Sequence, residues 1–354
     1  MSSPKKSLSN IEPQFSLHNG TTTTGVAAPL LQVRDLATEF ATRSGVARAV
    51  DGVSFNVFAG EIVGLVGESG SGKSVTGYSI LGLIDLPGRI TKGSVRLEGQ
   101  ELIGMARHQL RTLRGRRIAM VFQDPMSTLN PVLTVFAQMR LAMLAHGRPD
   151  DAQMRARALE ALGKVGIPDP ERRLEAYPHE LSGGMRQRVA IAIAFLNQPA
   201  LVICDEPTTA LDVSIQAQIL VEMKTLVREA GVSLVWISHD LATVSVLASR
   251  LLVMYAGRLI EEGPTAEVLS RPRHPYTQGL IDSLPSRAAP GRDLVQIPGS
   301  TPALTSLPSG CAFRERCAHA TAICSTAPVQ TIESPRTWSC HHPLNTHVAA
   351  ENDL

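Results

Sequence analysis

The apolar and polar residues of this chain follow patterns that predict an α/β fold. Between residues 31 and 61 apolar side chains recur at alternating positions, which is typical of antiparallel strands. Continuous apolar runs at 61–66, 201–205 and 232–237 are separated by helical patterns. Strands that alternate with helices favour parallel pairing, so these three runs predict the core of a parallel sheet.

Helical spacing and one hairpin account for much of the remaining pattern. Alanine and leucine recur at helical spacing over residues 151–165, which is the clearest helix of a mainly helical segment expected over about 97–185. A hairpin is predicted over 250–262, because alternating apolar positions lie on both sides of Ala256-Gly257. We therefore expect a helical subdomain beside the sheet.

The two ends of the chain differ in composition from its centre. Residues 1–29 are rich in Ser, Thr, Asn and Gly and lack periodic apolar positions, which predicts a disordered tail. Past Pro264, proline and glycine become frequent and the periodicity fades. We place a boundary near Ser270, which gives one domain over 30–270 and an extension over 271–354.

Length and charge restrict the classes of protein that fit. A chain of 354 residues can bury a large core. Its formal net charge of +2 gives no general electrostatic reason to bind nucleic acid. No apolar run approaches the roughly 20 residues of a membrane-spanning helix, and the N-terminus has no apolar signal region. We expect an intracellular protein, soluble by itself, that reaches a membrane only through a partner.

A phosphate-binding loop is the clearest chemical motif. It fits the pattern G-x-x-x-x-G-K-[ST] at every fixed position and lies between a predicted strand and a helix predicted over 74–84. Glycines allow backbone N–H groups to turn toward phosphate oxygens, and the following helix adds its positive end. Lys73 is expected on the β- and γ-phosphates and the Ser74 hydroxyl on Mg²⁺. The motif predicts an ATP site formed by Gly67, Glu68, Ser69, Gly70, Ser71, Gly72, Lys73 and Ser74, with Val75 next in the helix.

Polar residues at the ends of later strands suit hydrolysis. Asp205 ends an apolar strand and is expected to hold Mg²⁺. Glu206 follows it and is placed to act as general base on the attacking water. Gln123 and His239 follow two other strands. The carboxyl ends of parallel strands are where open α/β sheets bind ligands, so these four side chains should meet.

The segment Leu181-Ser182-Gly183-Gly184 resembles the signature motif of ATP-binding cassette (ABC) ATPases. The resemblance implies a RecA-like parallel-sheet core with an antiparallel β subdomain and a helical subdomain. It implies that this motif meets the γ-phosphate bound by a second subunit. By the same resemblance, Gln123 touches Mg²⁺, His239 contacts the γ-phosphate, Asp212 lies in the loop that crosses the dimer interface, and Phe40 stacks on adenine.

The extension narrows the resemblance. His274-Pro275-Tyr276-Thr277 resembles the segment found in ATPase subunits of dipeptide, oligopeptide and nickel importers. Met126 and Met185 resemble the D-type subunit, which pairs with an F-type homologue. This resemblance implies an ATPase on the cytoplasmic face of the inner membrane, partnered by that homologue or by itself, by two permease subunits and, through them, by an extracytoplasmic solute-binding protein. Import of nickel or a glutathione-like solute, a non-transport ABC ATPase and an inactive regulatory subunit are the alternatives.

Four of the five cysteines gather in the extension with the spacing C-x5-C-x6-C-x15-C. In an oxidising compartment such a group would suggest two disulfides, whereas in the cytosol clustered thiols more often bind metal. Wide gaps suit a loop around a four-thiolate [4Fe–4S] cluster, and importers of this family can carry one here. The neighbouring His341 and His342 keep Zn²⁺ as an alternative, and unligated structural thiols are a third. The residues concerned are Cys311, Cys317, Cys324 and Cys340; the fifth, Cys204, is expected in the core.

Overall fold

Strands that are apolar on both faces form the centre of an eight-stranded sheet. In the computed structural model, which describes residues 28–209, 211–287, 291, 293 and 295–344, its order is β11-β12-β10-β9-β3-β8-β7-β6. Neighbours from β9 to β6 pair in parallel, and the β9–β10, β10–β12 and β11–β12 pairs are antiparallel. The strands are β3 (Ile62–Val66), β6 (Ile118–Val121), β7 (Leu201–Asp205), β8 (Ser233–Ser238), β9 (Arg250–Tyr255), β10 (Arg258–Pro264), β11 (Thr331–Glu333) and β12 (Arg336–Trp338).

The two faces of this sheet bury different side chains of the same strands. In β7, Leu201 and Ile203 belong to one apolar cluster, whereas Val202 and Cys204 belong to the other. Every residue of β7 and β8 is buried, because layers cover both faces, as expected for parallel strands. Cys204 is therefore a core residue, as its sequence predicts.

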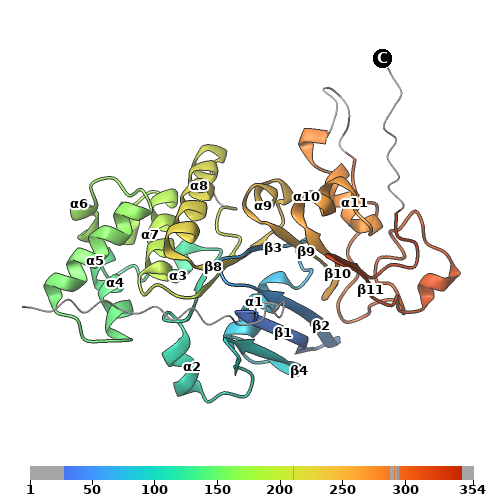
Figure 1. Ribbon diagram of the computed structural model, residues 1–354, viewed down its shortest axis with the longest axis horizontal. Coiled ribbons are helices and arrows are strands. Elements are labelled where there is room, and N and C mark those ends of the chain that lie inside the picture. The colour runs from blue at the N-terminus through green and yellow to red at the C-terminus, as the bar shows by residue number, and fades with distance from the viewer. Residues whose placement is uncertain (1–27, 210, 288–290, 292, 294, 345–354) are drawn as a thin grey trace, which may run out of the picture.

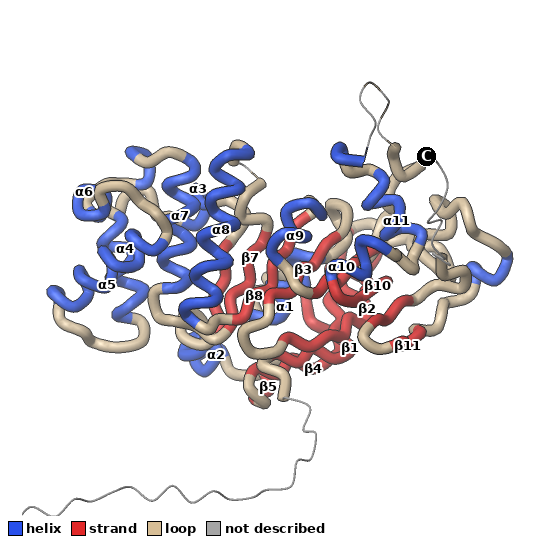
Figure 2. The backbone as a smooth tube through the Cα atoms, turned by 45° about the horizontal axis from the view of Figure 1, so that its top comes forward, coloured by secondary structure: helices blue, strands red, loops and turns tan. Residues whose placement is uncertain are grey.

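A smaller antiparallel sheet covers one face. Its order is β2-β1-β4-β5, and the long β1–β2 hairpin confirms the strands predicted between residues 31 and 61. Apolar residues of this sheet and of α1 (Lys73–Leu81) share one cluster with β3, β7 and β8. Figure 2 shows it below the larger sheet. Its strands are β1 (Leu31–Thr42), β2 (Gly45–Val57), β4 (Gly88–Leu97) and β5 (Gln100–Glu101).

The helices of residues 125–230 gather at the end of the larger sheet formed by β6, while the C-terminal segment lies at the opposite end (Figure 1). Short polar residues begin several of them: the Asp150 and Asp212 carboxylates cap α5 and α8. Within the described ranges, none of the helices has an apolar stretch long enough to cross a bilayer. The helices are α1 (Lys73–Leu81), α2 (Arg107–Leu113), α3 (Pro125–Thr128), α4 (Val135–Leu144), α5 (Asp151–Lys164), α6 (Pro170–Leu174), η1 (Pro178–Glu180), α7 (Gly183–Phe195), α8 (Val213–Ala230), α9 (Leu241–Leu247), α10 (Thr265–Ser270), α11 (Pro275–Asp282), η2 (Pro285–Arg287) and η3 (Ala322–Ser325).

Observed elements differ from the expected boundaries in two places. The segment expected to be mainly helical contains β4, β5 and β6, and its continuous helical part runs from α3 to α7. The boundary near Ser270 does not separate two structures, because β12 pairs with β10 and joins the extension to the main sheet. We call the described part of residues 271–344 the C-terminal lobe. The predicted N-terminal tail lies outside the described residues, apart from residues 28 and 29.

Candidate active site

Backbone contacts explain the glycines of the phosphate loop, which joins β3 to α1. Gly67 and Gly72 have φ angles of +154° and +104°, values that residues with a side chain rarely adopt. A Cβ on Gly67 would lie 2.2 Å from the Met254 carbonyl oxygen, and one on Gly72 would lie 2.1 Å from that of Ala49. Neither backbone oxygen can move easily, so the loop needs glycine at both places.

The Lys73 side chain is folded back over this loop. Its Nζ donates to the carbonyl oxygens of Gly67 at 2.8 Å and Glu68 at 2.9 Å. Burial lowers the pKa of the amino group, and the carboxylates of Glu206 and Asp205 oppose that shift. The cation therefore lies on the backbone of the phosphate loop, near the carboxylates of Glu206 and Asp205.

Ser74 and Asp205 meet at the end of β7, as their positions in the sequence predict. The Ser74 hydroxyl donates to Asp205 Oδ1 at 2.7 Å. The other oxygen, Oδ2, is buried without a hydrogen-bond partner among the described residues. Burial raises the pKa of this carboxyl group. A divalent cation would satisfy the unpaired oxygen, and one carboxylate plus one hydroxyl suits Mg²⁺, which keeps water and phosphate oxygens as its other ligands.

Three polar side chains surround the carboxylate of Glu206. Its Oε2 accepts hydrogen bonds from the amide of Gln123 at 3.3 Å and the hydroxyl of Thr209 at 3.1 Å. His239 Nδ1 lies 3.1 Å from the same oxygen. The structure therefore brings Gln123, Glu206 and His239 together. Thr209 was not predicted to act here, although a hydroxyl three residues after Glu206 is the signal that points to it.

Beside these groups lies a cavity of about 610 Å³. Its wall includes residues of the phosphate loop, Val75, Gln123, Glu206 and His239. Three apolar residues that the sequence did not indicate also line it: Ala49 of β2, Leu280 of α11 and Leu304. Leu280 and Leu304 belong to the C-terminal lobe, so this lobe forms part of the wall of the cavity.

Phe40 lies elsewhere. It is on β1 opposite Ala47, and a Cβ added to Gly88 would lie 2.5 Å from its ring. It is not among the residues that line the cavity. The ring therefore packs on β4, and its stacking on adenine stays a prediction.

The Glu68 side chain points away from the role that the phosphate-loop motif gives it and binds the C-terminal lobe. It lines the cavity through its place in the phosphate loop, but its carboxylate binds the guanidinium of Arg316 at 2.6 and 2.9 Å. That hydrogen-bonded ion pair holds the pKa of the Glu68 carboxyl below its usual range. Its side chain is therefore committed to the C-terminal lobe.

The signature residues form a second group that does not line the cavity. The Ser182 hydroxyl accepts from Met185 N at 3.3 Å and caps α7. A Cβ on Gly184 would lie 2.9 Å from Ile215, so this glycine adjoins the segment that follows Asp212. Asp212 itself caps α8. Ser182, Gly183, Gly184 and Asp212 thus lie at the starts of two helices and outside this chain's own cavity.

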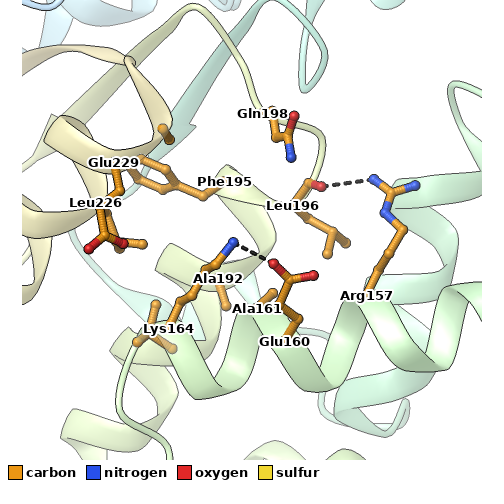
Figure 3. A pocket seen from close by; sticks show the side chains of 12 residues that line it. Arg157, Glu160, Ala161, Lys164, Ala192, Phe195, Leu196, Gln198, Leu226 and Glu229 are labelled. Atoms are coloured by element: carbon orange, nitrogen blue, oxygen red, sulfur yellow. Dashed lines mark hydrogen bonds and ion pairs between the residues drawn. The ribbon is translucent and has the colours of Figure 1, made fainter.

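A hollow of about 470 Å³ between α5, α7 and α8 offers a contrast. There the Lys164 amino group binds Glu160, and the Arg157 guanidinium donates to the Leu196 carbonyl oxygen (Figure 3). These charged groups on α5 are already paired. The hollow lacks the glycine loop that lines the cavity beside Glu206.

The four cysteines of the extension are free thiols near one another. Burial, with a smaller contribution from the sulfurs of Cys311, Cys317 and Cys324, raises the pKa of Cys340 to about 11. Among the described residues, no group of three or more His, Cys, Asp or Glu side chains is arranged to hold a metal ion.

The two histidines beside the cysteines have other partners. His342 Nε2 lies 2.7 Å from the Thr321 hydroxyl. His341 Nε2 lies 3.1 Å from the Thr326 carbonyl oxygen.

Two protein families match this chain. The family described as ABC transporter matches residues 50–209, and the one described as oligopeptide/dipeptide transporter, C-terminal region, matches residues 260–324. The chain is 45% identical over 318 residues to the dipeptide transport ATP-binding protein DppD of Escherichia coli K12, covering 89% of this chain and 97% of that protein. It is 43% identical over 319 residues to the oligopeptide transport ATP-binding protein OppD of the same organism, covering 90% and 94%.

Solved structures agree with the sequence relatives. The dimeric structure of a post-hydrolysis state of the ATP-binding cassette MJ0796, bound to ADP and Pi, matches with a TM-score of 0.61 at 29% identity. The match covers 66% of this chain and 98% of that one. It spans the cassette fold that the sequence predicts.

Proposed function

The chain belongs to the ATP-binding subunits of ABC transporters that import peptides, and from this premise we propose that it hydrolyses ATP to drive uptake of dipeptides or oligopeptides. The single observation that carries the proposal is the joint match of a cassette and an oligopeptide-type C-terminal region, with near-complete coverage of DppD. Import of nickel or of a glutathione-like solute is the alternative.

The residues in and beside the cavity support a role in hydrolysis. The loop amides and Lys73 would hold the phosphates, while Ser74 and Asp205 would hold Mg²⁺, which neutralises charge on the β- and γ-phosphates. Glu206 would orient the attacking water and accept its proton. Gln123 and His239 share one oxygen of Glu206, which leaves its other oxygen for the water.

Each site needs a second cassette. Because Ser182, Gly183, Gly184 and Asp212 do not line this chain's own cavity, we propose that they complete a nucleotide site on the partner subunit. An F-type homologue is the partner we favour, and a second copy of this chain is the alternative. All residues named for hydrolysis are present here, which argues against an inactive regulatory subunit.

A groove beside the cavity suits the membrane partner. It has a volume of about 580 Å³ and an apolar wall that includes Phe122, Leu133 and Leu141. Phe122 immediately precedes Gln123. We propose that a permease segment docks here, at the cytoplasmic face of the inner membrane, so that movement of Gln123 with the nucleotide reaches the permease.

The four thiols form a separate proposed site. We propose that Cys311, Cys317, Cys324 and Cys340 hold an iron–sulfur cluster, since these four free cysteines gather in one segment and the adjacent histidines are engaged by threonines. A cluster of several iron atoms spaces its thiolates more widely than one Zn²⁺ does. Iron, sulfide and zinc analysis of protein purified without oxygen tests this: zinc alone, or no metal, would reject the cluster.

Uptake measurements test the transport role. Glu206→Gln is placed at the native locus, and entry of labelled dipeptides, oligopeptides and nickel is followed in the cells. We expect loss of one class of peptide, whereas Glu229→Gln, on the exposed end of α8, should transport normally. Loss of nickel uptake alone would assign the other cargo, and unchanged uptake of all three would contradict the proposal.

A further inference from the structure

The second residue of the phosphate loop is held by the C-terminal lobe. Arg316 Nη1 donates to Glu68 Oε2 at 2.6 Å, and Nη2 donates to Oε1 at 2.9 Å. Two parallel bonds between a guanidinium and a carboxylate fix both distance and direction. The two residues are 248 positions apart in the chain, so no local pattern places them together.

The guanidinium of Arg316 is itself held on several sides. Its side chain is only 5% exposed, compared with 28% for Glu68. Its Nε donates to the Pro298 carbonyl oxygen at 2.8 Å, and its centre lies 5.8 Å from the rings of both Tyr255 and Phe313. Such packing removes the freedom that makes exposed ion pairs weak.

The lobe also binds the other polar groups of Glu68. The Tyr276 hydroxyl accepts the Glu68 backbone N–H at 2.8 Å, and the Thr301 hydroxyl donates to Oε2 at 3.0 Å. The remaining polar group is the Glu68 carbonyl oxygen, which accepts from Lys73 Nζ at 2.9 Å. A continuous set of hydrogen bonds therefore runs from Arg316 through Glu68 to the lysine that meets the phosphates.

We propose that Arg316 is a positioning residue for ATP turnover. Through Glu68 it holds the phosphate loop and Lys73 in the conformation that receives the triphosphate, so the C-terminal lobe is part of the nucleotide site. This inference rests on the proposed ATPase function. Beyond that function, it assigns the C-terminal lobe a role in binding ATP.

The test compares variants of the full chain in the assembled transporter. Arg316→Gln removes the ion pair, and we expect the KM for ATP to rise about 10-fold, equivalent to about 1.4 kcal/mol. The kcat at saturating ATP should change much less, because bound nucleotide itself orders the loop. Arg316→Lys keeps the charge without the paired geometry, so its KM for ATP should lie between those of the unmodified protein and Arg316→Gln. Arg314→Gln is the matched control, since that guanidinium binds Ser309 and not the loop.

A double variant separates positioning from general stability. If the pair acts as one unit, Glu68→Gln combined with Arg316→Gln should raise KM no more than either change alone. An unchanged KM in both Arg316 variants, or additive effects, would overturn the inference. Should Arg316→Gln fail to fold, Arg316→Lys and Glu68→Gln decide the matter by the same measurement. Absence of ATP hydrolysis in the unmodified transporter would instead contradict the proposed function itself.

Discussion

The carboxyl edge of the parallel sheet and the C-terminal lobe both form the nucleotide cavity, but different forces place them. At the edge, β7 and β8 are buried throughout, and the apolar runs before Glu206 and His239 fix where these residues emerge. In the lobe, β11 is exposed along its whole length. The lobe depends instead on contacts between residues distant in sequence.

Aromatic packing and a buried ion pair are among the contacts that hold the lobe to the sheet. Tyr276 and Phe313 pack on Tyr255 of β9, with ring centroids 4.6 and 5.3 Å away. Arg336 of β12 binds Glu261 of β10 at 2.6 Å, and both side chains are buried. One site can therefore combine functional residues that are placed by strand periodicity with supporting residues that are placed by tertiary packing.

The largest effect should come from the sheet edge. Glu206→Gln removes the proposed base while keeping the size of the side chain, so turnover should fall about 10²–10⁴-fold with ATP binding retained. Steady-state hydrolysis and nucleotide binding by the assembled transporter measure the two quantities. Near-normal turnover would remove Glu206 from the role of base.

The next largest effects should come from truncating core side chains, which destabilise the sheet and the lobe differently. Leu234, fully buried in β8, supports the whole sheet, so Leu234→Ala should lower the free energy of unfolding by about 2–5 kcal/mol. Phe313→Ala should cost about as much but loosen mainly the lobe. Hydrogen exchange followed residue by residue distinguishes them: loss of protection spread equally over β3 and β7 in the Phe313 variant would contradict a separately held lobe.

Low pH should lower the stability of the lobe through His274. This imidazole is 1% exposed, its Nδ1 accepts from Tyr276 N at 3.0 Å to cap α11, and burial lowers its pKa from 6.5 to about 3. Between these values the unfolded chain binds a proton that the folded chain does not. Stability should therefore be full above pH 6.5 and fall as pH decreases toward 3, by up to about 1.4 kcal/mol per unit.

A non-titrating cap tests that slope. Asparagine also accepts a backbone hydrogen bond at a helix start, so His274→Asn should flatten the dependence of unfolding free energy on pH between 3 and 6.5. Equal slopes in both proteins, measured by denaturant titration at several pH values, would assign the dependence to other groups.

The smallest effect should come from one hydroxyl. Tyr276→Phe removes the acceptor of the Glu68 N–H while keeping the ring between Tyr255 and Phe313. We expect a loss of about 0.5–1.5 kcal/mol in unfolding free energy and a modest rise in the KM for ATP. An unchanged KM together with an unchanged stability would show that the hydroxyl does not hold the loop.

Sequence alone predicted the edge of the sheet well because its signals are local. The apolar runs before Asp205 and His239 and the hairpin at Ala256-Gly257 follow from side-chain periodicity and turn chemistry. The Arg316–Glu68 pair gave no signal, since each residue is ordinary in its own segment. Leu280 and Leu304 were missed for the same reason: only tertiary packing places them in the cavity wall.

The order of synthesis gives the Glu68–Arg316 pair one more consequence. The phosphate loop leaves the ribosome 248 residues before its arginine partner. At about 5–20 residues per second, this separation corresponds to roughly 12–50 seconds. During synthesis the phosphate loop therefore lacks the Glu68–Arg316 ion pair until the C-terminal lobe is made, and a chain truncated before Arg316 never forms this pair.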